Sequence, residues 1–259
     1  MRIKVVLPAP LGPMTTQRSS SSTCQSMGPT NVAPPRANST PLAMARPCAS
    51  AAASSRAASS TAPSSGTHAD PAALDVVVNK TRPVAPPDWA PSDLVAVPGS
   101  ELSLRAEAAT AAGDLLDAAA AAGHRLTTLS AYRSYDYQVR TYGHWVDELG
   151  RAEADRVSAR PGHSEHQAGL SWDVGDAATP ACDLEACFGD TAAGRWVAAH
   201  AAEYGFVIRY PAGAEDVTGF AHEPWHLRYV GSAEAARVEA AGGVLETAWG
   251  LPPAPDYAD

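Results

Sequence analysis

The sequence predicts an α+β protein with a small, mostly antiparallel sheet flanked by helices. One reason is that segments of helical and of strand periodicity are mixed, without the regular alternation of a parallel α/β sheet. The other is that all the aromatic residues (6 Trp, 8 Tyr and 3 Phe) lie between Trp89 and Tyr257. Because large apolar residues build a core, we expect one compact core within that stretch.

The first seventy residues differ in composition from the rest. They hold 13 Ser, 7 Thr, 13 Ala and 9 Pro, and no aromatic residue. Such a segment buries too little apolar surface to offset the conformational entropy that folding removes. We therefore expect residues 1–70 to be a low-complexity, disordered linker or an upstream segment included by a misplaced start codon. Residues 71–250 would then form the domain, and residues 251–259 a C-terminal tail.

The charge of the chain argues against one class of partner, and its hydropathy argues against a transmembrane segment. The chain has a net charge of −9, and residues 71–259 alone carry 13 basic and 27 acidic side chains. This acidity argues against a nucleic-acid partner, which needs a basic face. No run of eighteen apolar residues is present, so we expect no transmembrane segment. The apolar stretch at the start ends at Pro8, which is too short for the core of a secretory signal.

The first half of the domain begins with an extended lead-in over residues 71–100, in which Val76–Val78 is a candidate strand. Leu104–Ala122 is rich in Ala and Leu, and its apolar residues recur at three-to-four spacing. That spacing predicts an amphipathic helix, which Gly123 closes. The stretch that follows, Arg125–Ala131, has the composition of a strand.

The second half begins with a helix from Tyr135, predicted by apolar residues at spacings of four and three and ended by Gly150. The stretch from Ser158 to Asp176 is rich in Gly, His and Ser, and we expect it to be irregular. The remaining predicted elements are a helix at about Thr191–Tyr204, strands at Phe206–Tyr210 and Trp225–Val230, and a short helix from Ser232.

Two polar clusters carry the residues suited to chemistry, Ser164–Asp173 and Glu223–His226. The chain lacks the G-x-G-x-x-G, P-loop, G-x-S-x-G, S-x-x-K and H-E-x-x-H motifs. A catalytic zinc site needs three protein ligands with nitrogen or oxygen donors and an open position for water. His166, Asp173 and His226 would meet that requirement.

Two further residues could act beside such a metal. Glu223 precedes His226 by three residues across a proline, so its carboxylate could take a proton from an attacking water. Arg133 follows the strand predicted at Arg125–Ala131. An arginine at a strand end can point its donors at a carboxylate or a developing oxyanion.

The cysteines leave the redox compartment open. Cys24 and Cys48 lie in the low-complexity segment, whereas Cys182 and Cys187 lie in the domain. Four intervening residues allow a small disulfide-closed loop, which would favour an oxidising compartment, but two free thiols have the same spacing. No C-x-x-C pair is present, so a cysteine-based zinc site is not expected.

Five separated motifs together resemble those of the VanY-type zinc D-alanyl-D-alanine carboxypeptidases. The motifs are S-A-Y-R-S-Y-x-x-Q from Ser130, S-x-H-x-x-G-x-x-x-D from Ser164, Y-G-F-x-x-R-Y-P from Tyr204, T-G at Thr218 and E-P-W-H-x-R-Y-V-G from Glu223. They occur in the family's order, and the resemblance extends from about Val78 to Gly250. These enzymes are peptidoglycan metallopeptidases of the Hedgehog/DD-peptidase fold, so the resemblance implies that fold here.

The resemblance also implies roles for individual residues. It makes His166, Asp173 and His226 the ligands of one zinc ion per chain, Glu223 the general base and Arg133 the group that polarises the scissile carbonyl. Ser164 and Gln138 fall where the family holds the terminal D-residue of the substrate and its carboxylate. The pair Cys182 and Cys187 fits secreted relatives, which favours a disulfide.

The implied function is removal of the terminal D-alanine from peptidoglycan stem peptides ending in D-Ala-D-Ala. The enzyme would act as a monomer outside the cytoplasmic membrane, in the cell envelope or secreted. The alternatives are an L,D-carboxypeptidase or a D-Ala-D-Ala dipeptidase of the same fold, a non-catalytic zinc-containing wall-binding module, and a serine hydrolase built on Ser164. Glu223 argues against a binding module, since binding alone needs no base.

Overall fold

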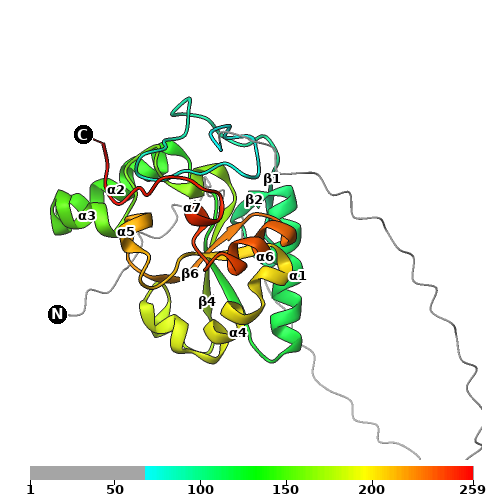
Figure 1. Cartoon of the computed structure of the whole chain (residues 1–259). Coiled ribbons are helices and arrows are strands. Elements are labelled where there is room, and N and C mark those ends of the chain that lie inside the picture. Colours follow the sequence, from blue (N-terminus) through cyan, green and yellow to red (C-terminus); the bar gives the residue numbers. More distant parts are fainter. Residues whose placement is uncertain (1–67, 259) are drawn as a thin grey trace, which may run out of the picture. The chain divides into compact units, whose positions relative to one another are not determined.

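The centre of the protein is a four-stranded antiparallel sheet, in a computed structural model that describes residues 68–258 (Figure 1). The strands run in the order β3 (Leu126–Ser130), β4 (Ser171–Asp176), β6 (Glu223–Tyr229) and β5 (Phe206–Tyr210). A separate two-stranded ribbon pairs β1 (Leu94–Ala96) with β2 (Ser103–Arg105). Residues 1–67, with Cys24, Cys48 and nearly all of the expected linker, lie outside the described residues.

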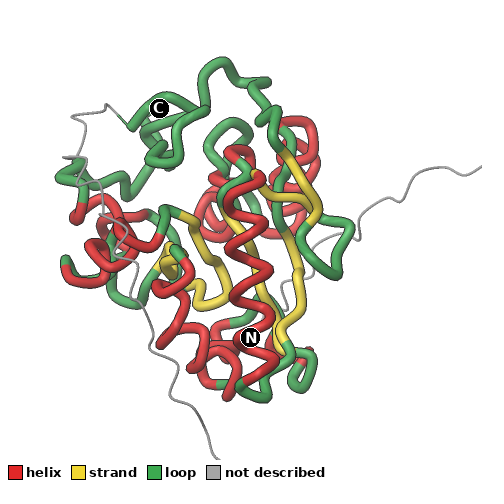
Figure 2. Tube along the Cα trace, turned by 90° about the vertical axis from the view of Figure 1, so that its right-hand side faces the viewer, coloured by secondary structure: helices red, strands yellow, loops and turns green. Residues whose placement is uncertain are grey.

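Helices surround this sheet, so the predicted α+β class is confirmed. The longer helices are α1 (Ala106–Ala121), α2 (Tyr135–Leu149), α3 (Arg151–Val157), α4 (Ala192–His200) and α6 (Ser232–Ala240). The short ones are α5 (Glu215–Thr218), α7 (Leu245–Ala248) and the 3₁₀ turns η1 (Glu165–Ala168), η2 (Pro180–Cys182), η3 (Ala186–Asp190) and η4 (Ala201–Tyr204). Figure 2 views the molecule from the side of α1, which lies in front of the strands.

The two faces of the sheet have different chemistry. Side chains alternate along a strand, and Trp172 and Val174 of β4 enter the main core together with the alanines of α1. The residues that alternate with them, Ser171 and Asp173, face the other side and are also buried. His226 of β6 pairs with Asp173 across the strands. One face of the sheet therefore packs the core, and the other presents buried polar groups.

The structure differs in part from the sequence-based expectation for the stretch 158–176. Residues 158–164 are irregular as expected, but η1 and β4 follow. The alternation of Ser171, Trp172, Asp173 and Val174 is that of a strand. A prediction from hydropathy misses this strand, because the residues on its second face are polar although they are buried.

The expected strand at Val76–Val78 does not form either. These three valines are buried. In place of a neighbouring strand, the guanidinium of Arg228 donates hydrogen bonds to the carbonyl oxygens of Leu74 (2.9 Å) and Val76 (2.7 Å). A buried side chain therefore holds a segment that sequence periodicity assigns to the sheet.

The C-terminal end of the domain extends beyond the expected bound at residue 250. The amide of Ala254, which is fully buried, donates to the carbonyl oxygen of Val217 at 2.8 Å. The hydroxyl of Tyr257 accepts a hydrogen bond from the Arg160 amide at 2.9 Å. Residues expected to form a tail thus pack on the domain. Within residues 68–258, none of the helices has the length and hydropathy to cross a membrane.

Candidate functional site

His166, Asp173 and His226 converge on the polar face of the sheet. Asp173 and His226 are direct cross-strand partners on β4 and β6, and His166 comes from η1 just before β4. All three are buried, and one ligand atom from each lies within 4.8 Å of the others. The His166 Nε2 is 3.3 Å from one Asp173 oxygen, and the His226 Nδ1 is 3.3 Å from the other. The arrangement is a compact cluster of two nitrogen donors and one carboxylate.

Backbone contacts fix the orientation of His166. Its Nδ1 lies 2.7 Å from the carbonyl oxygen of Ala131, which accepts hydrogen bonds and cannot donate them. The proton of a neutral imidazole must therefore sit on Nδ1, and Nε2 presents a lone pair to Asp173. The turn that places the ring ends at Gly169, whose φ of 69° lies in the left-handed region that glycine adopts without strain.

The electrostatics of the cluster favour a cation. Burial lowers the pKa of His166 to about 4, with the charge of Arg133 acting in the same direction. Burial alone would raise the pKa of Asp173, but the neighbouring His166, His226 and Arg133 lower it to about 2. At neutral pH a neutral imidazole and a carboxylate therefore face each other with lone pairs.

Unsatisfied atoms point to the same conclusion. Among the described residues, the His166 Nε2 and the Asp173 Oδ1 are buried without a hydrogen-bond partner. Buried polar atoms are rarely left unpaired, because removing them from water carries a free-energy penalty. A divalent metal would satisfy both atoms, and two imidazoles with one carboxylate are a donor set that suits zinc. The residues present therefore fit the metal that the sequence pattern indicates.

Glu223 reaches the cluster through an irregularity in β6. In a regular strand, residues three apart point to opposite faces. Here Ile208 pairs with Leu227 and Tyr210 with Glu223, so a step of two residues on β5 matches a step of four on β6. The resulting bulge turns Glu223 toward His226, with 3.2 Å between the Glu223 Oε2 and the His226 Nδ1. Bulges of this kind commonly redirect side chains next to active sites.

His226 is the more basic of the two histidines. Burial lowers its pKa, but the hydrogen bond with Glu223 and the charges of Asp173 and Glu223 outweigh burial, and its pKa is raised overall. Its Nδ1 faces the cluster between the two carboxylates. The side of the ring that could bind a metal is therefore the side that contacts the candidate base.

Arg133 lies three residues beyond the end of β3, next to the cluster of His166, Asp173 and His226. Ser130 of β3 pairs with Asp173, and three residues later the Arg133 amide donates to the carbonyl oxygen of His166 at 3.2 Å. The side chain lines the cavity beside the cluster, and its charge acts on both Asp173 and Glu223. Its Nε is buried without a partner in the described part of the chain, so it retains a donor for a ligand.

The cavity next to these residues has a volume of about 70 Å³. Ser164 lines it together with all three cluster residues. Gln138 does not line it, because its amide donates to the carbonyl oxygen of Ala159 at 2.7 Å. Ala159 itself is part of the lining. Gln138 thus lies one layer behind the cavity wall, and the substrate-binding roles of Ser164 and Gln138 remain predictions.

Sequence reasoning missed the apolar part of the lining. The largest of these side chains come from five separate segments and are Trp145, Leu184, Tyr210, Phe220 and Trp225. Tyr210 and Trp225 stand inside two of the sequence motifs, which was a signal that they belong to the site. Leu184 and Phe220 carried no such signal, since each is an isolated apolar residue in a loop.

A buried ion-pair network behind the cavity was also missed. Glu165 accepts hydrogen bonds from the Arg209 Nε (2.9 Å) and the Arg228 Nη1 (3.2 Å). Arg209 also binds Glu246 of α7 through two hydrogen bonds, at 2.9 and 2.6 Å. The side chains of these four residues are fully buried. Two arginines balance two carboxylates, and the network ties the residue next to His166 to β5, β6 and α7.

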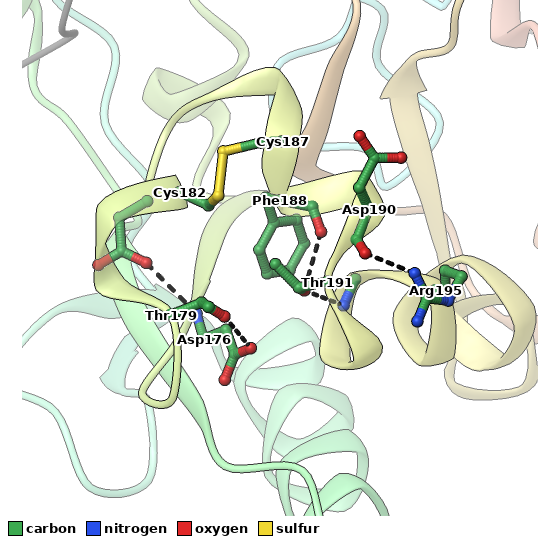
Figure 3. The surroundings of a disulfide bond; sticks show 10 residues. Asp176, Thr179, Cys182, Cys187, Phe188, Asp190, Thr191 and Arg195 are labelled. Atoms are coloured by element: carbon green, nitrogen blue, oxygen red, sulfur yellow. Dashed lines mark hydrogen bonds between the residues drawn. A yellow bond between two sulfur atoms is a disulfide. The ribbon is translucent and has the colours of Figure 1, made fainter.

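Cys182 and Cys187 are joined by a disulfide, with their Cα atoms 5.4 Å apart (Figure 3). The loop that the disulfide closes follows β4 and precedes α4. The spacing alone is compatible with two free thiols or with a disulfide, and the structure contains the disulfide.

Comparison with known proteins places the chain in a family of carboxypeptidases. The family model for VanY, D-alanyl-D-alanine carboxypeptidase, matches residues 101–232. The putative carboxypeptidase YodJ of Bacillus subtilis is 41% identical over 181 residues, which are 66% of this chain and 65% of that protein. The match therefore spans slightly less than two thirds of the length of this relative.

Two kinds of solved structure are similar to the chain. The LD-carboxypeptidase LdcB has a TM-score of 0.65 at 38% identity, over 70% of this chain and 88% of LdcB. A mutant of the vancomycin-resistance D,D-pentapeptidase VanY, in complex with Zn(II), has a TM-score of 0.57 at 28% identity, over 66% of this chain and 96% of that one.

Proposed function

The chain belongs to the VanY family of D-alanyl-D-alanine carboxypeptidases, and we propose that it removes the terminal D-alanine from peptides ending in D-Ala-D-Ala. The observation that carries the proposal is the convergence of His166, Asp173 and His226 with Glu223 in one buried site. The substrate would be a peptidoglycan stem peptide.

His166, Asp173 and His226 would hold one zinc ion per chain. Bound zinc supplies a Lewis acid and brings the pKa of water close to neutrality. The VanY structure named above is a complex with Zn(II), which supports this choice of metal. The Ala131 carbonyl oxygen keeps the His166 Nε2 free of a proton, so this side chain is ready to bind a metal at neutral pH.

Glu223 and Arg133 would perform the proton transfer and stabilise charge. The Glu223 carboxylate takes a proton from the attacking water, whose oxygen bonds to the carbonyl carbon of the scissile peptide. The carbon–nitrogen bond then breaks, and Glu223 gives the proton to the leaving amine of D-alanine. Arg133, with its buried Nε lacking a partner among the described residues, stabilises the negative charge that develops on the carbonyl oxygen.

Recognition of the substrate's terminal carboxylate would fall to Ser164, with Gln138 acting from behind the cavity wall. Ser164 lines the cavity beside His166. Gln138 contacts Ala159 and the Ser158 hydroxyl, at 2.7 and 3.4 Å. We therefore propose that Gln138 orients the Ser158–Ala159 segment toward the substrate, in addition to any direct contact.

L,D-carboxypeptidase activity is the second candidate, and a specific observation favours it. The LD-carboxypeptidase LdcB has a higher identity to this chain than the D,D-pentapeptidase VanY, 38% against 28%, and a higher TM-score. The two activities differ in the configuration of the residue before the scissile bond. A dipeptidase activity is a further member of this set, since the VanXYC protein of Enterococcus gallinarum is named as a bifunctional dipeptidase and carboxypeptidase.

The disulfide supports an extracytoplasmic location. Disulfides persist in oxidising compartments and are rare in the cytosol, and Cys182 is bonded to Cys187. A substrate in the cell wall requires the same location. We propose that the protein acts in the cell envelope or after secretion, as a monomer.

The decisive experiment measures D-alanine release from three peptides: a pentapeptide ending in D-Ala-D-Ala, a tetrapeptide ending in L-Lys-D-Ala, and the dipeptide D-Ala-D-Ala. We expect turnover with about one zinc per chain, loss of activity with a chelator and recovery with added zinc. Glu223→Gln should lower kcat by about 10³-fold, because a general base contributes about 10²- to 10⁴-fold. The control is Glu239→Gln, an exposed glutamate on α6.

The outcomes separate the candidates. Release from the pentapeptide supports the D,D-activity, whereas release from the tetrapeptide alone supports the L,D-activity. Bound zinc with no turnover on any peptide would favour a wall-binding module. Activity that survives both the chelator and Glu223→Gln would exclude the zinc mechanism and leave the serine hydrolase.

A further inference from the structure

Leu184 has a backbone conformation that leucine rarely adopts. Its φ is +55°, and in residues 68–258 His68 is the one other non-glycine residue with positive φ. Bulky side chains in this region are sterically strained, and such strain persists where the surrounding structure enforces it. The Leu184 side chain is not exposed by this conformation, since the residue is only 9% accessible. It lines the cavity that also contains His166 and Asp173.

The disulfide encloses this residue. Cys182 and Cys187 are bonded (Figure 3). The six-residue segment that they close contains Leu184. Directly after the loop, the ring of Phe188 is fully buried in the main core. The loop therefore has a covalent closure and an apolar anchor on its C-terminal side.

A second anchor joins the loop to the strand that carries Asp173. The Asp183 carboxylate accepts a hydrogen bond from the Asp176 amide at 3.3 Å, at the end of β4. At Gly175, a Cβ atom would collide with this carboxylate and with the Thr127 hydroxyl. Glycine is thus the residue that allows the loop to lie directly on β4, two positions beyond the candidate metal ligand.

The loop contributes an apolar wall to the site. The cavity beside the cluster has a volume of about 70 Å³, and Leu184 is one of its apolar lining residues. Leu184 shares its lining with the rings of Phe220 and Trp225. In the proposed function a substrate side chain next to the scissile bond lies in this cavity, where a larger side chain would contact Leu184.

We propose that Leu184 is a specificity-determining residue, which the disulfide-closed loop holds in the cavity to exclude large side chains next to the scissile bond. The inference rests on the proposed carboxypeptidase function, because it concerns the substrate of the same site. It predicts preference for a small residue such as D-alanine through steric exclusion, with no part in the chemical step.

Leu184→Ala and Leu184→Gly test the proposal in the full-length protein. The substrates are acyl-L-Lys-D-Ala-D-Ala, acyl-L-Lys-D-Ala-D-Leu and acyl-L-Lys-D-Leu-D-Ala, so that each position beside the scissile bond is enlarged separately. We expect the ratio of kcat/KM for one D-leucine peptide to that for the D-alanine peptide to rise at least about 10-fold in both variants, since apolar pockets discriminate by about 10- to 200-fold per methylene. The glycine variant accepts the positive φ and protects the test against simple misfolding.

A matched control lies in the same loop. Ala186 is exposed and does not line the cavity, so Ala186→Gly should leave the substrate ratio unchanged. The double variant Cys182→Ser, Cys187→Ser should shift the ratio in the same direction as the Leu184 variants, because the loop loses its closure. Unchanged ratios in both Leu184 variants would overturn the proposal.

A binding measurement separates this inference from the proposed function. The affinities of Glu223→Gln for the same three peptides are measured by calorimetry, with and without Leu184→Ala. If the wild-type protein cleaves no peptide, the proposed function fails, and a shift of the affinity ratio toward a D-leucine peptide still supports the role of Leu184. An affinity ratio that does not change, or no binding of any peptide, overturns that role.

Discussion

Glu165 shows how one buried side chain supports a site that it does not enter chemically. Its neighbour along the chain is His166, and its own carboxylate accepts hydrogen bonds from Arg209 and Arg228. A buried charge is tolerated when partners neutralise it and satisfy its lone pairs. The arginines come from β5 and β6, so the turn that presents His166 is fixed to the sheet through Glu165.

Removing that charge should destabilise the protein strongly. Glu165→Gln leaves two buried guanidinium groups with Glu246 as their remaining carboxylate in the network. Breaking a buried ion pair by removing one partner lowers the free energy of unfolding by about 3–5 kcal/mol, because a buried charge loses its compensation. Urea denaturation of the variant measures this quantity.

An exposed ion pair provides the control. Glu153 and Arg156 of α3 lie 4.0 Å apart and are largely exposed. Glu153→Gln should change the free energy of unfolding by less than about 1 kcal/mol, since surface pairs contribute little. Equal effects of the two substitutions would show that the network around Glu165 is no stronger than a surface contact.

At the scale of single residues, the sequence predicts which side chains could bind a metal or a substrate. It predicts less well the buried residues that hold those side chains in place. His166, Asp173, His226 and Glu223 are chemically distinctive, and their spacing within short motifs survives folding. Arg209 and Arg228 stand in two of the five motifs, but nothing in the sequence shows that they are buried and paired with Glu165. Pairing across 44 and 63 residues depends on the sheet register, which a single sequence does not specify.

At the scale of elements, β4 and β6 form the platform of the site. Their register places Asp173 opposite His226. Helices α1, α2, α4 and α6 and strands β3, β5 and β6 could be predicted from periodicity, whereas α3 and the β1–β2 ribbon escape it. β4 could not, since both its faces are buried and one is polar. The β6 bulge that redirects Glu223 also lies beyond periodicity, although a proline after Glu223 is a sign of an irregular strand.

The start of α2 offers a test of how an element positions a site residue. Ser134 is the N-cap of α2, and its hydroxyl accepts a hydrogen bond from the Tyr137 amide at 3.2 Å. It directly follows Arg133. Ser134→Ala should lower the free energy of unfolding by about 1 kcal/mol, the usual loss for an N-cap. Because the freed helix end also carries Arg133, we expect kcat to fall as well, by a few fold.

Thr191→Ala is the matched comparison, since Thr191 caps α4 through a hydrogen bond from the Gly194 amide at 2.9 Å. α4 packs on the apolar face of the sheet and carries no candidate site residue. Its loss of stability should be similar, with kcat unchanged. A fall in kcat that is as large for Thr191→Ala as for Ser134→Ala would show that α2 has no special link to the site.

At the scale of the whole molecule, the first and last parts of the described domain meet at the ion-pair network behind the site. Asn79 of the lead-in donates to Glu246 of α7 at 3.1 Å, which connects the first and last parts of the domain to the ion-pair network. Composition predicts a boundary near residue 70, because the aromatic residues begin after it. It could not predict the packing of residues 251–258, which are rich in proline and resemble a tail in composition.

The role of the C-terminal segment gives a prediction for the whole fold. Tyr257 is 8% exposed, its ring lies 3.9 Å from the Arg160 guanidinium, and its hydroxyl accepts from the Arg160 amide. A fragment of residues 68–259 should fold and keep metal content and activity, because these contacts are internal to it. Ending the fragment at Gly250 should lower the free energy of unfolding by about 2–4 kcal/mol, since burial of one aromatic side chain contributes about 1.5–3 kcal/mol and a hydrogen bond about 1 kcal/mol.

Thermal and urea denaturation compare the stabilities of the two fragments. Tyr257→Phe in the longer fragment isolates the contribution of the hydroxyl. If the shorter fragment were as stable as the longer one, residues 251–258 would be a tail in energetic terms, whatever their contacts.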